Sequence, residues 1–300
     1  MKKFIKLIII FSVPILFLLI IIEFSLRDIP NDYKYKKEYL NNNSNELEVL
    51  FLGNSHVYFG INPVYINKKS FNASHISQSL DYDLAILKKY EGELKNLKYV
   101  IVPIDYFSFY SNLEYGIENW RIKNYVIYYD MPQKNSFWDN FEILNGKFEN
   151  NLLRLTSNQS NITCNTLGWG TIYNSKNNKN LDDTGLISSK RHTVIKDNSI
   201  YDKNIQVVNS FIDFANRKNI KLIFITSPAY KTYSENLNKE QLETSINTIN
   251  KLISGKTNSK YYNLLNDNSF KKGDFYDADH LNEIGAKKLS IKIDSLLRLN

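Results

Sequence analysis

The sequence predicts a doubly wound α/β domain with a parallel sheet, carried behind an N-terminal membrane helix. Short apolar runs bounded by turn residues alternate with amphipathic helical patterns from residue 47 onward. Strands that alternate with helices favour parallel pairing, because each helix carries the chain back across the sheet. The 300 residues are enough for a substantial hydrophobic core.

The N-terminal segment combines three lysines within six residues with an apolar stretch that continues to Leu26. A helix of about 20 apolar residues spans a bilayer core, and the stretch reaches that length with Glu23 at one interface. Lysines stay in the cytoplasm, so the rest of the chain is expected on the periplasmic or outer side of a bacterial cell membrane. A cleaved signal peptide is the alternative, but no small-x-small cleavage site follows. Residues 1–30 are therefore predicted to be an uncleaved single-pass anchor.

Residues 31–46 are polar and unpatterned, which predicts a tether before a domain at 47–300. The stretch from about 107 to 199 is aromatic, rich in Asn and without a strand–helix rhythm, so it is expected to be an irregular insertion. Strands are predicted at 47–53, 70–75, 98–104, 221–228 and 260–265. Helices are predicted at 81–94, 201–219, 238–254 and 281–300.

Composition excludes several classes of function. The net charge of +7 is spread thinly and no nucleic-acid motif is present, so no nucleic-acid partner is expected. The single cysteine, Cys164, excludes an internal disulfide and a Cys-only metal site. Asp277, Asp279 and His280 suggest a metal site only weakly, because further ligands are lacking. We expect neither a metal nor a cofactor.

The first strand ends in Gly53-Asn54-Ser55-His56, and ligands of open α/β sheets bind at the carboxyl ends of strands. At a strand-to-helix junction the unsatisfied backbone N–H groups can stabilise an oxyanion, which makes Ser55 a candidate nucleophile. A simple turn is the alternative, since such residues cluster at strand ends.

The histidine that a serine nucleophile needs is predicted near the C-terminus. Asp277 and His280 are three residues apart, so within one turn the carboxylate can reach the imidazole. Asn282 is expected to cap the final helix and to leave His280 on the loop before it. Ser55, His280 and Asp277 then form a candidate triad.

The segments FLGNSH and DADHLNEIGA resemble the first and last motif blocks of the SGNH (GDSL-like) hydrolase superfamily, over residues 47 to 299. The resemblance implies a flavodoxin-like three-layer αβα sandwich and catalytic roles for Ser55, Asp277 and His280. The α/β-hydrolase fold is disfavoured, because its nucleophile turn requires glycine where Val57 stands.

Two family blocks depart from the expected pattern. The second block places Ser74 or Ser77 where a glycine N–H lines the oxyanion hole in the family. The third offers Asp105 instead of an asparagine, and a carboxylate donates no hydrogen bond unless it is protonated. Gln78 and Asn54 are the substitute donors that we consider.

Five further residues are predicted to line a substrate pocket: His56, His75, Asp105, Tyr230 and Lys231. The side chain of His56 is expected to point away from Ser55. His192 lies among polar residues of the insertion and is expected at the surface.

The sequence therefore predicts a serine-dependent enzyme that transfers or hydrolyses an acyl ester, most simply acetyl, on an envelope or secreted polysaccharide. Its resemblance to anchored proteins of envelope acylation implies a multi-pass membrane acyltransferase as a partner. The alternative is a non-catalytic module with the same fold that binds polysaccharide or organises a complex. Hydrolysis versus transfer, the acyl group, the polymer and the oligomeric state stay open.

Overall fold

The computed structural model describes residues 1–132, 136–144, 148–157, 160–194 and 198–299. The chain divides into two compact units. Unit 1 comprises residues 1–38 and 117–162, and unit 2 comprises 39–116 and 163–300. The predicted boundaries differ from this division, because residues 117–162 of the expected insertion group with the N-terminal helix, while 163–199 group with the sheet.

Unit 2 is built on one sheet of five parallel strands in the order β2-β1-β3-β4-β5. This order is that of flavodoxin-like folds. All five predicted strands are present and the α/β fold class is confirmed. The strands are β1 (Val49–Phe51), β2 (Ser70–Asn72), β3 (Tyr99–Pro103), β4 (Lys221–Thr226) and β5 (Ser259–Asn263).

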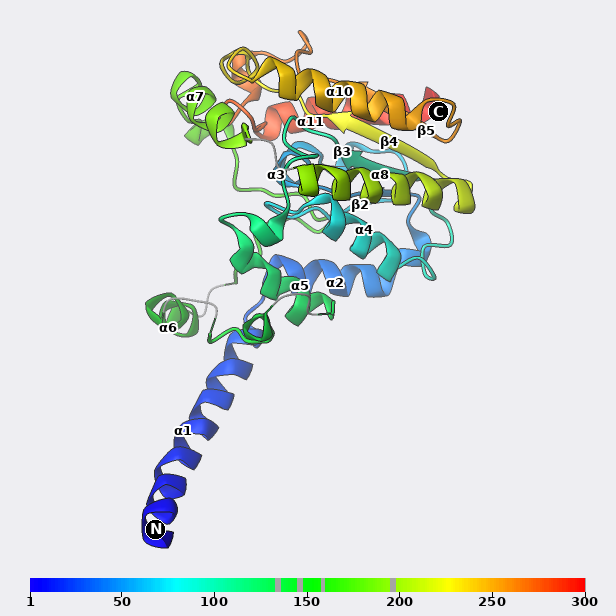
Figure 1. Cartoon of the computed structure of the whole chain (residues 1–300). Coiled ribbons are helices and arrows are strands. Elements are labelled where there is room, and N and C mark those ends of the chain that lie inside the picture. The colour runs from blue at the N-terminus through cyan, green and yellow to red at the C-terminus, as the bar shows by residue number, and fades with distance from the viewer. Residues whose placement is uncertain (133–135, 145–147, 158–159, 195–197, 300) are drawn as a thin grey trace. The chain divides into compact units, whose positions relative to one another are not determined.

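Helices cover both faces of this sheet (Figure 1). One face carries α3 (Ser55–Gly60) and α11 (Glu283–Leu299), which share a core with side chains of β1, β3 and β4. The other helical layer runs through α4 (Leu80–Lys89), α8 (Asn198–Lys218) and α10 (Lys239–Ile253). The shorter helices α7 (Leu181–His192) and α9 (Lys231–Ser234) pack against each other.

The turn at residues 163–173 packs on the helix that follows Ser55. Trp169 donates its indole N–H to the carbonyl oxygen of Phe59 at 2.6 Å, and the Asn72 N–H bonds the Leu167 carbonyl at 3.0 Å. Gly168 has φ +86°, and a Cβ there would overlap the carbonyl of Asn72. Glycine is therefore required for this close approach.

Unit 1 contains α1 (Lys2–Asp28), the start of α2 (Asp32–Asn43), α5 (Ile122–Tyr129) and α6 (Phe148–Ser157). Among the described residues, α1 is the one helix long and apolar enough to cross a membrane. The expected tether at 31–46 is instead largely α2. Asn31 begins it by accepting the N–H groups of Tyr33 and Lys34, which is N-cap chemistry that we did not identify in the polar run.

Candidate active site

The turn after β1 presents Ser55 at the first position of α3. Gly53 has φ +131°, and a Cβ there would overlap the ring of Pro103, so the turn requires glycine. The side chain of Asn54 caps the helix by accepting the N–H of His56 at 2.9 Å. The local sequence thus fixes Ser55 at the carboxyl edge of the sheet.

Ser55, His280 and Asp277 lie in one hydrogen-bonded chain. Ser55 Oγ is 2.8 Å from His280 Nε2, and His280 Nδ1 is 2.9 Å from Asp277 Oδ1. Since a carboxylate can only accept, this pairing assigns the ring proton to Nδ1 and leaves Nε2 as the acceptor for the serine proton. Both distances lie within the range for proton transfer.

The loop that carries His280 is held by hydrogen bonds from backbone N–H groups to the side chains of Asp277 and Asn282. Asp277 Oδ1 also accepts the backbone N–H groups of His280, at 2.8 Å, and of Asp279, at 3.2 Å. Asn282 Oδ1 accepts the N–H groups of Ile284 and Gly285, as expected of a cap for α11. The imidazole therefore has a fixed orientation on the loop that leads into α11.

A second histidine–carboxylate pair lies beside the first. His56 Nδ1 is 3.0 Å from Asp105 Oδ2, and His56 Nε2 is 3.5 Å from Asp279 Oδ2, with all three side chains buried. Burial lowers the pKa of His56, but these two carboxylates outweigh it and raise the pKa to about 10. The ring of His56 lies beside the triad, because its centroid is 4.9 Å from that of His280.

Asp105, expected in the substrate pocket, is hydrogen-bonded to the turn that carries Ser55. Its carboxylate accepts the Asn54 side-chain N–H and the Ser227 backbone N–H, each at 3.0 Å. Burial alone raises the pKa of Asp105, but the charge and hydrogen bond of His56 hold it below the usual value. The carboxylate therefore stays ionised and contributes no donor to an oxyanion.

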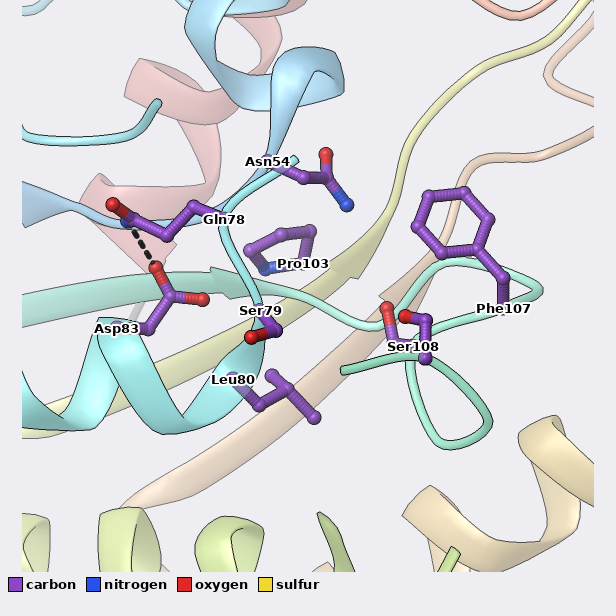
Figure 2. A pocket seen from close by; sticks show the side chains of 9 residues that line it. Asn54, Gln78, Ser79, Leu80, Asp83, Pro103, Phe107 and Ser108 are labelled. Carbon is purple, nitrogen blue, oxygen red and sulfur yellow. Dashed lines mark hydrogen bonds between the residues drawn. The ribbon is translucent and has the colours of Figure 1, made fainter. Parts of the chain in front are cut away.

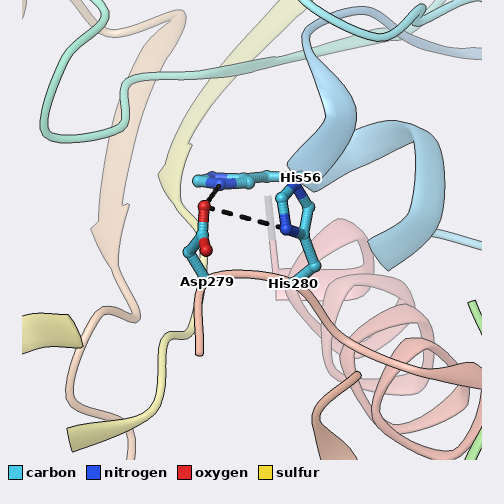
Figure 3. A group of neighbouring side chains, drawn as sticks. All are labelled: His56, Asp279 and His280. Carbon is cyan, nitrogen blue, oxygen red and sulfur yellow. Dashed lines mark ion pairs between the residues drawn. The ribbon is translucent and has the colours of Figure 1, made fainter. Parts of the chain in front are cut away.

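Asp279 is the centre of a buried cluster that the sequence did not reveal (Figure 3). Its Oδ2 lies 3.7 Å from His280 Nδ1, 3.8 Å from Arg191 Nη2 and 4.0 Å from His192 Nδ1. Burial raises the pKa of Asp279, but the charges of His280 and His56 outweigh it and lower the pKa well below the usual range. The motif DADH contains two carboxylates, and only the fold shows that both face His280.

His192 is not at the surface as expected. Its side chain is largely buried, and Nδ1 is 2.9 Å from the Tyr233 hydroxyl. Burial, only partly offset by Asp279, lowers the pKa of His192 to about 3, so this ring is neutral.

His56, Asp279 and His280 bring possible metal ligands within 4.8 Å of one another. A cation there would have to take Nδ1 of His280 away from Asp277 and displace the proton of His56. These residues therefore fit a proton-bearing network better than a metal centre.

Three of the four predicted oxyanion donors are already engaged. Asn54 donates to Asp105, Gln78 Nε2 donates to Asp83 Oδ1 at 2.5 Å, and the Ser74 N–H bonds Asn72 Oδ1. Asn54 and Gln78 line a pocket (Figure 2). Its volume of about 10 Å³ leaves room for about one water. Ser77 remains, and its φ of +59° is the conformation that a glycine normally supplies.

The other predicted pocket residues are His75, Tyr230 and Lys231. His75 is buried and donates its N–H to the Gly53 carbonyl. Tyr230 donates its N–H to the Ala278 carbonyl, and its ring meets that of Phe275 edge to face. Lys231 begins α9 and is exposed.

An aromatic stack that the sequence did not reveal stands beside the triad. The Tyr173 ring stacks between Phe59 and Tyr276, at centroid distances of 3.7 and 3.8 Å. Its edge meets His280 at 5.3 Å. Only the packing of residues 163–173 on α3 brings these three rings together.

The sheet order and the Ser–His–Asp chain at its carboxyl edge define an α/β protein with a serine-hydrolase type of site. No family model and no curated protein matches the chain. Among solved structures it is similar to a proposed platelet activating factor from Streptococcus pneumonia, with 13% identity and a TM-score of 0.45 over 96% of this chain and 98% of the other.

Two further solved structures are similar to the chain. One is a proposed acylhydrolase from Bacteroides fragilis, with 11% identity and a TM-score of 0.42 over 87% of this chain and 94% of the other. The other is a GDSL-like lipase from Bacteroides thetaiotaomicron, with 12% identity and a TM-score of 0.39 over 89% and 98%.

Proposed function

We propose that the chain is a serine-dependent acyl-ester enzyme of the SGNH type, with Ser55 as nucleophile, His280 as general base and Asp277 as its orienting carboxylate. The hydrogen-bonded chain from Ser55 Oγ through both ring nitrogens of His280 to Asp277 is the observation that supports this most directly. Two segments far apart in the sequence supply it: the turn that carries Ser55 and the loop that carries Asp277 and His280.

In the proposed reaction, Ser55 Oγ bonds to the acyl carbonyl carbon while its proton passes to His280 Nε2. The tetrahedral intermediate then expels the alcohol oxygen, which takes that proton from Nε2. Water or a sugar hydroxyl next gives its proton to Nε2 and attacks the acyl-serine. Cleavage of the Ser55 ester, with the proton returned to Oγ, releases an acid or a new ester and restores the enzyme.

Two charged states of this cycle need stabilisation. Asp277 lies against the imidazolium that forms on His280, and Asp279 adds a second carboxylate 3.7 Å from the same nitrogen. For the oxyanion we propose the backbone N–H groups of Ser55 and Ser77, since neither makes a recorded hydrogen bond to a described residue.

We further propose that the substrate is an acylated envelope or secreted polysaccharide, with acetyl as the simplest acyl group. The apolar helix α1 supports a site held at the extracytoplasmic membrane surface. Tyr276, the half-buried end of the stack with Tyr173 and Phe59, offers one flat ring face for a sugar near His280. Transfer, unlike hydrolysis, would also need a membrane acyltransferase that delivers the acyl group.

A non-catalytic, polysaccharide-binding module remains the second candidate, because Asp105 stands where the family has an asparagine donor. Hydrogen bonds from Asn54 and Ser227, together with His56, occupy its carboxylate, so this side chain cannot serve the oxyanion.

The test compares full-length wild type with Ser55→Ala in detergent, using a chromogenic acetyl ester and a serine-reactive phosphonate. We expect Ser55→Ala to lose on the order of 10⁴-fold in kcat and all phosphonate labelling. Ser295→Ala, at an exposed position of α11, is the matched control and should behave as wild type. Equal rates in wild type and Ser55→Ala, with no labelling of either, would favour the binding module.

A further inference from the structure

Exposed apolar side chains are concentrated in unit 1 even outside α1. Within residues 117–153 the described large apolar side chains that are exposed are Ile117, Trp120, Phe137, Trp138, Leu144, Leu152 and Leu153. Phe137 is 62% exposed and Trp138 59%, which is high for side chains of this size. A concentration of this kind on one short segment indicates an interaction surface.

The segment that carries Phe137, Trp138 and Leu144 is fixed to the outer end of α1. Glu23 accepts the backbone N–H groups of Glu142 at 3.0 Å and Ile143 at 2.9 Å. Arg27, one turn further on, donates to the carbonyl of Asn140 at 2.5 Å and to Glu23 at 2.7 Å. Residues 140–143 therefore lie level with the last two turns of α1.

Glu142 joins this segment to two helices. Its carboxylate is buried and accepts from Lys123 of α5, from Arg154 of α6 at 2.8 Å, and from the Tyr128 hydroxyl at 2.7 Å. Helix α6 also packs against α1 (Figure 1). The exposed Leu152 and Leu153 are thus held near the same end of α1 as Phe137 and Trp138.

We propose that residues 136–144 and 148–157, which we call the collar, lie in the outer interface of the bilayer that α1 crosses. This rests on the proposed membrane anchor and is independent of the catalytic proposal. Glu23 marks the end of the apolar span, so side chains fixed beside it are at headgroup level. Trp and Phe are enriched at that level, and interfacial helices bury Leu, Phe and Trp there.

The test uses the full chain with Trp120→Phe and Trp169→Phe, so that Trp138 is the single tryptophan. The protein is reconstituted into phosphatidylcholine vesicles with and without bromine on the acyl chains. We expect brominated lipid to quench Trp138 emission and aqueous iodide to have little effect. Adding Phe137→Ser and Leu153→Ser should weaken the lipid quenching, because both anchoring side chains are then polar.

Resistance to alkaline extraction shows separately whether α1 is in the bilayer. A chain that resists extraction but whose Trp138 is quenched only by iodide would overturn the collar and leave the anchor standing. A Trp138 reached by neither quencher would also overturn it, and would indicate a protein partner or a second copy instead. Release of the chain by alkaline extraction would overturn both the collar and the anchor. The catalytic proposal is tested separately, by the ester assay.

Discussion

Two histidine–carboxylate pairs lie side by side in unit 2, and they differ in what their second ring nitrogen faces. In the pair of His280 and Asp277, that nitrogen faces Ser55 Oγ at 2.8 Å. In the pair of His56 and Asp105, it faces a second carboxylate, Asp279, at 3.5 Å. The ring centroids are 4.9 Å apart.

The difference shows that residue type does not determine the role of a histidine. A ring between two buried carboxylates keeps its proton, as the pKa of about 10 for His56 indicates, and cannot act as a base near neutral pH. A ring between one carboxylate and a serine can accept and return a proton. We therefore infer that His56 stabilises the structure of the site as a cation, whereas His280 acts as the general base.

The largest expected effect on activity comes from breaking the pair of His280 and Asp277. Asp277→Asn keeps the shape but can donate to Nδ1, which favours the tautomer with its proton on Nε2, the wrong nitrogen for a base. We expect kcat for the chromogenic ester to fall on the order of 10³- to 10⁴-fold, with little change in thermal stability. A decrease of less than tenfold would contradict the assigned role, and Asp213→Asn, at an exposed position of α8, serves as the control.

The second prediction breaks the buried pair. His56→Gln leaves the carboxylates of Asp105 and Asp279 without their cation, so we expect a loss of about 3–5 kcal/mol in the free energy of unfolding, measured by urea denaturation. In the double variant with Asp105→Asn, part of that loss should be recovered, because one unpaired charge is gone. Strictly additive losses would show that the two side chains are not coupled.

The third prediction is a pH dependence of stability. The pKa of His56 is about 10 in the folded state and about 6.5 when unfolded, so the folded state holds this proton more tightly. Its contribution is complete below about pH 6.5 and is lost as pH rises toward 10, at no more than about 1.4 kcal/mol per pH unit. Between pH 6 and 10 the melting temperature should therefore fall more steeply with pH for wild type than for His56→Gln. Parallel curves would contradict a charged His56.

The sequence was sufficient for features of the structure that depend on local pattern. The five strands and the positions of Ser55, Asp277 and His280 followed from apolar runs, turn residues and a three-residue spacing. The roles of Asp279 and His192 did not, because they arise where segments about 90 residues apart pack together. The tether was mispredicted for a different reason: the cap at Asn31 and the burial of Tyr33 against Tyr125 and Tyr129 override a polar composition.

The hydrogen bonds of Glu23 also decide where the chain can be shortened. A recombinant form that begins at Asp28 or later would leave the N–H groups of Glu142 and Ile143 without their acceptor and would remove Arg27 from Asn140. Each unsatisfied buried group costs about 1–3 kcal/mol, which is a large share of the stability of so small a unit. A form that is cut before Glu23 loses most of the apolar stretch and keeps these hydrogen bonds within unit 1.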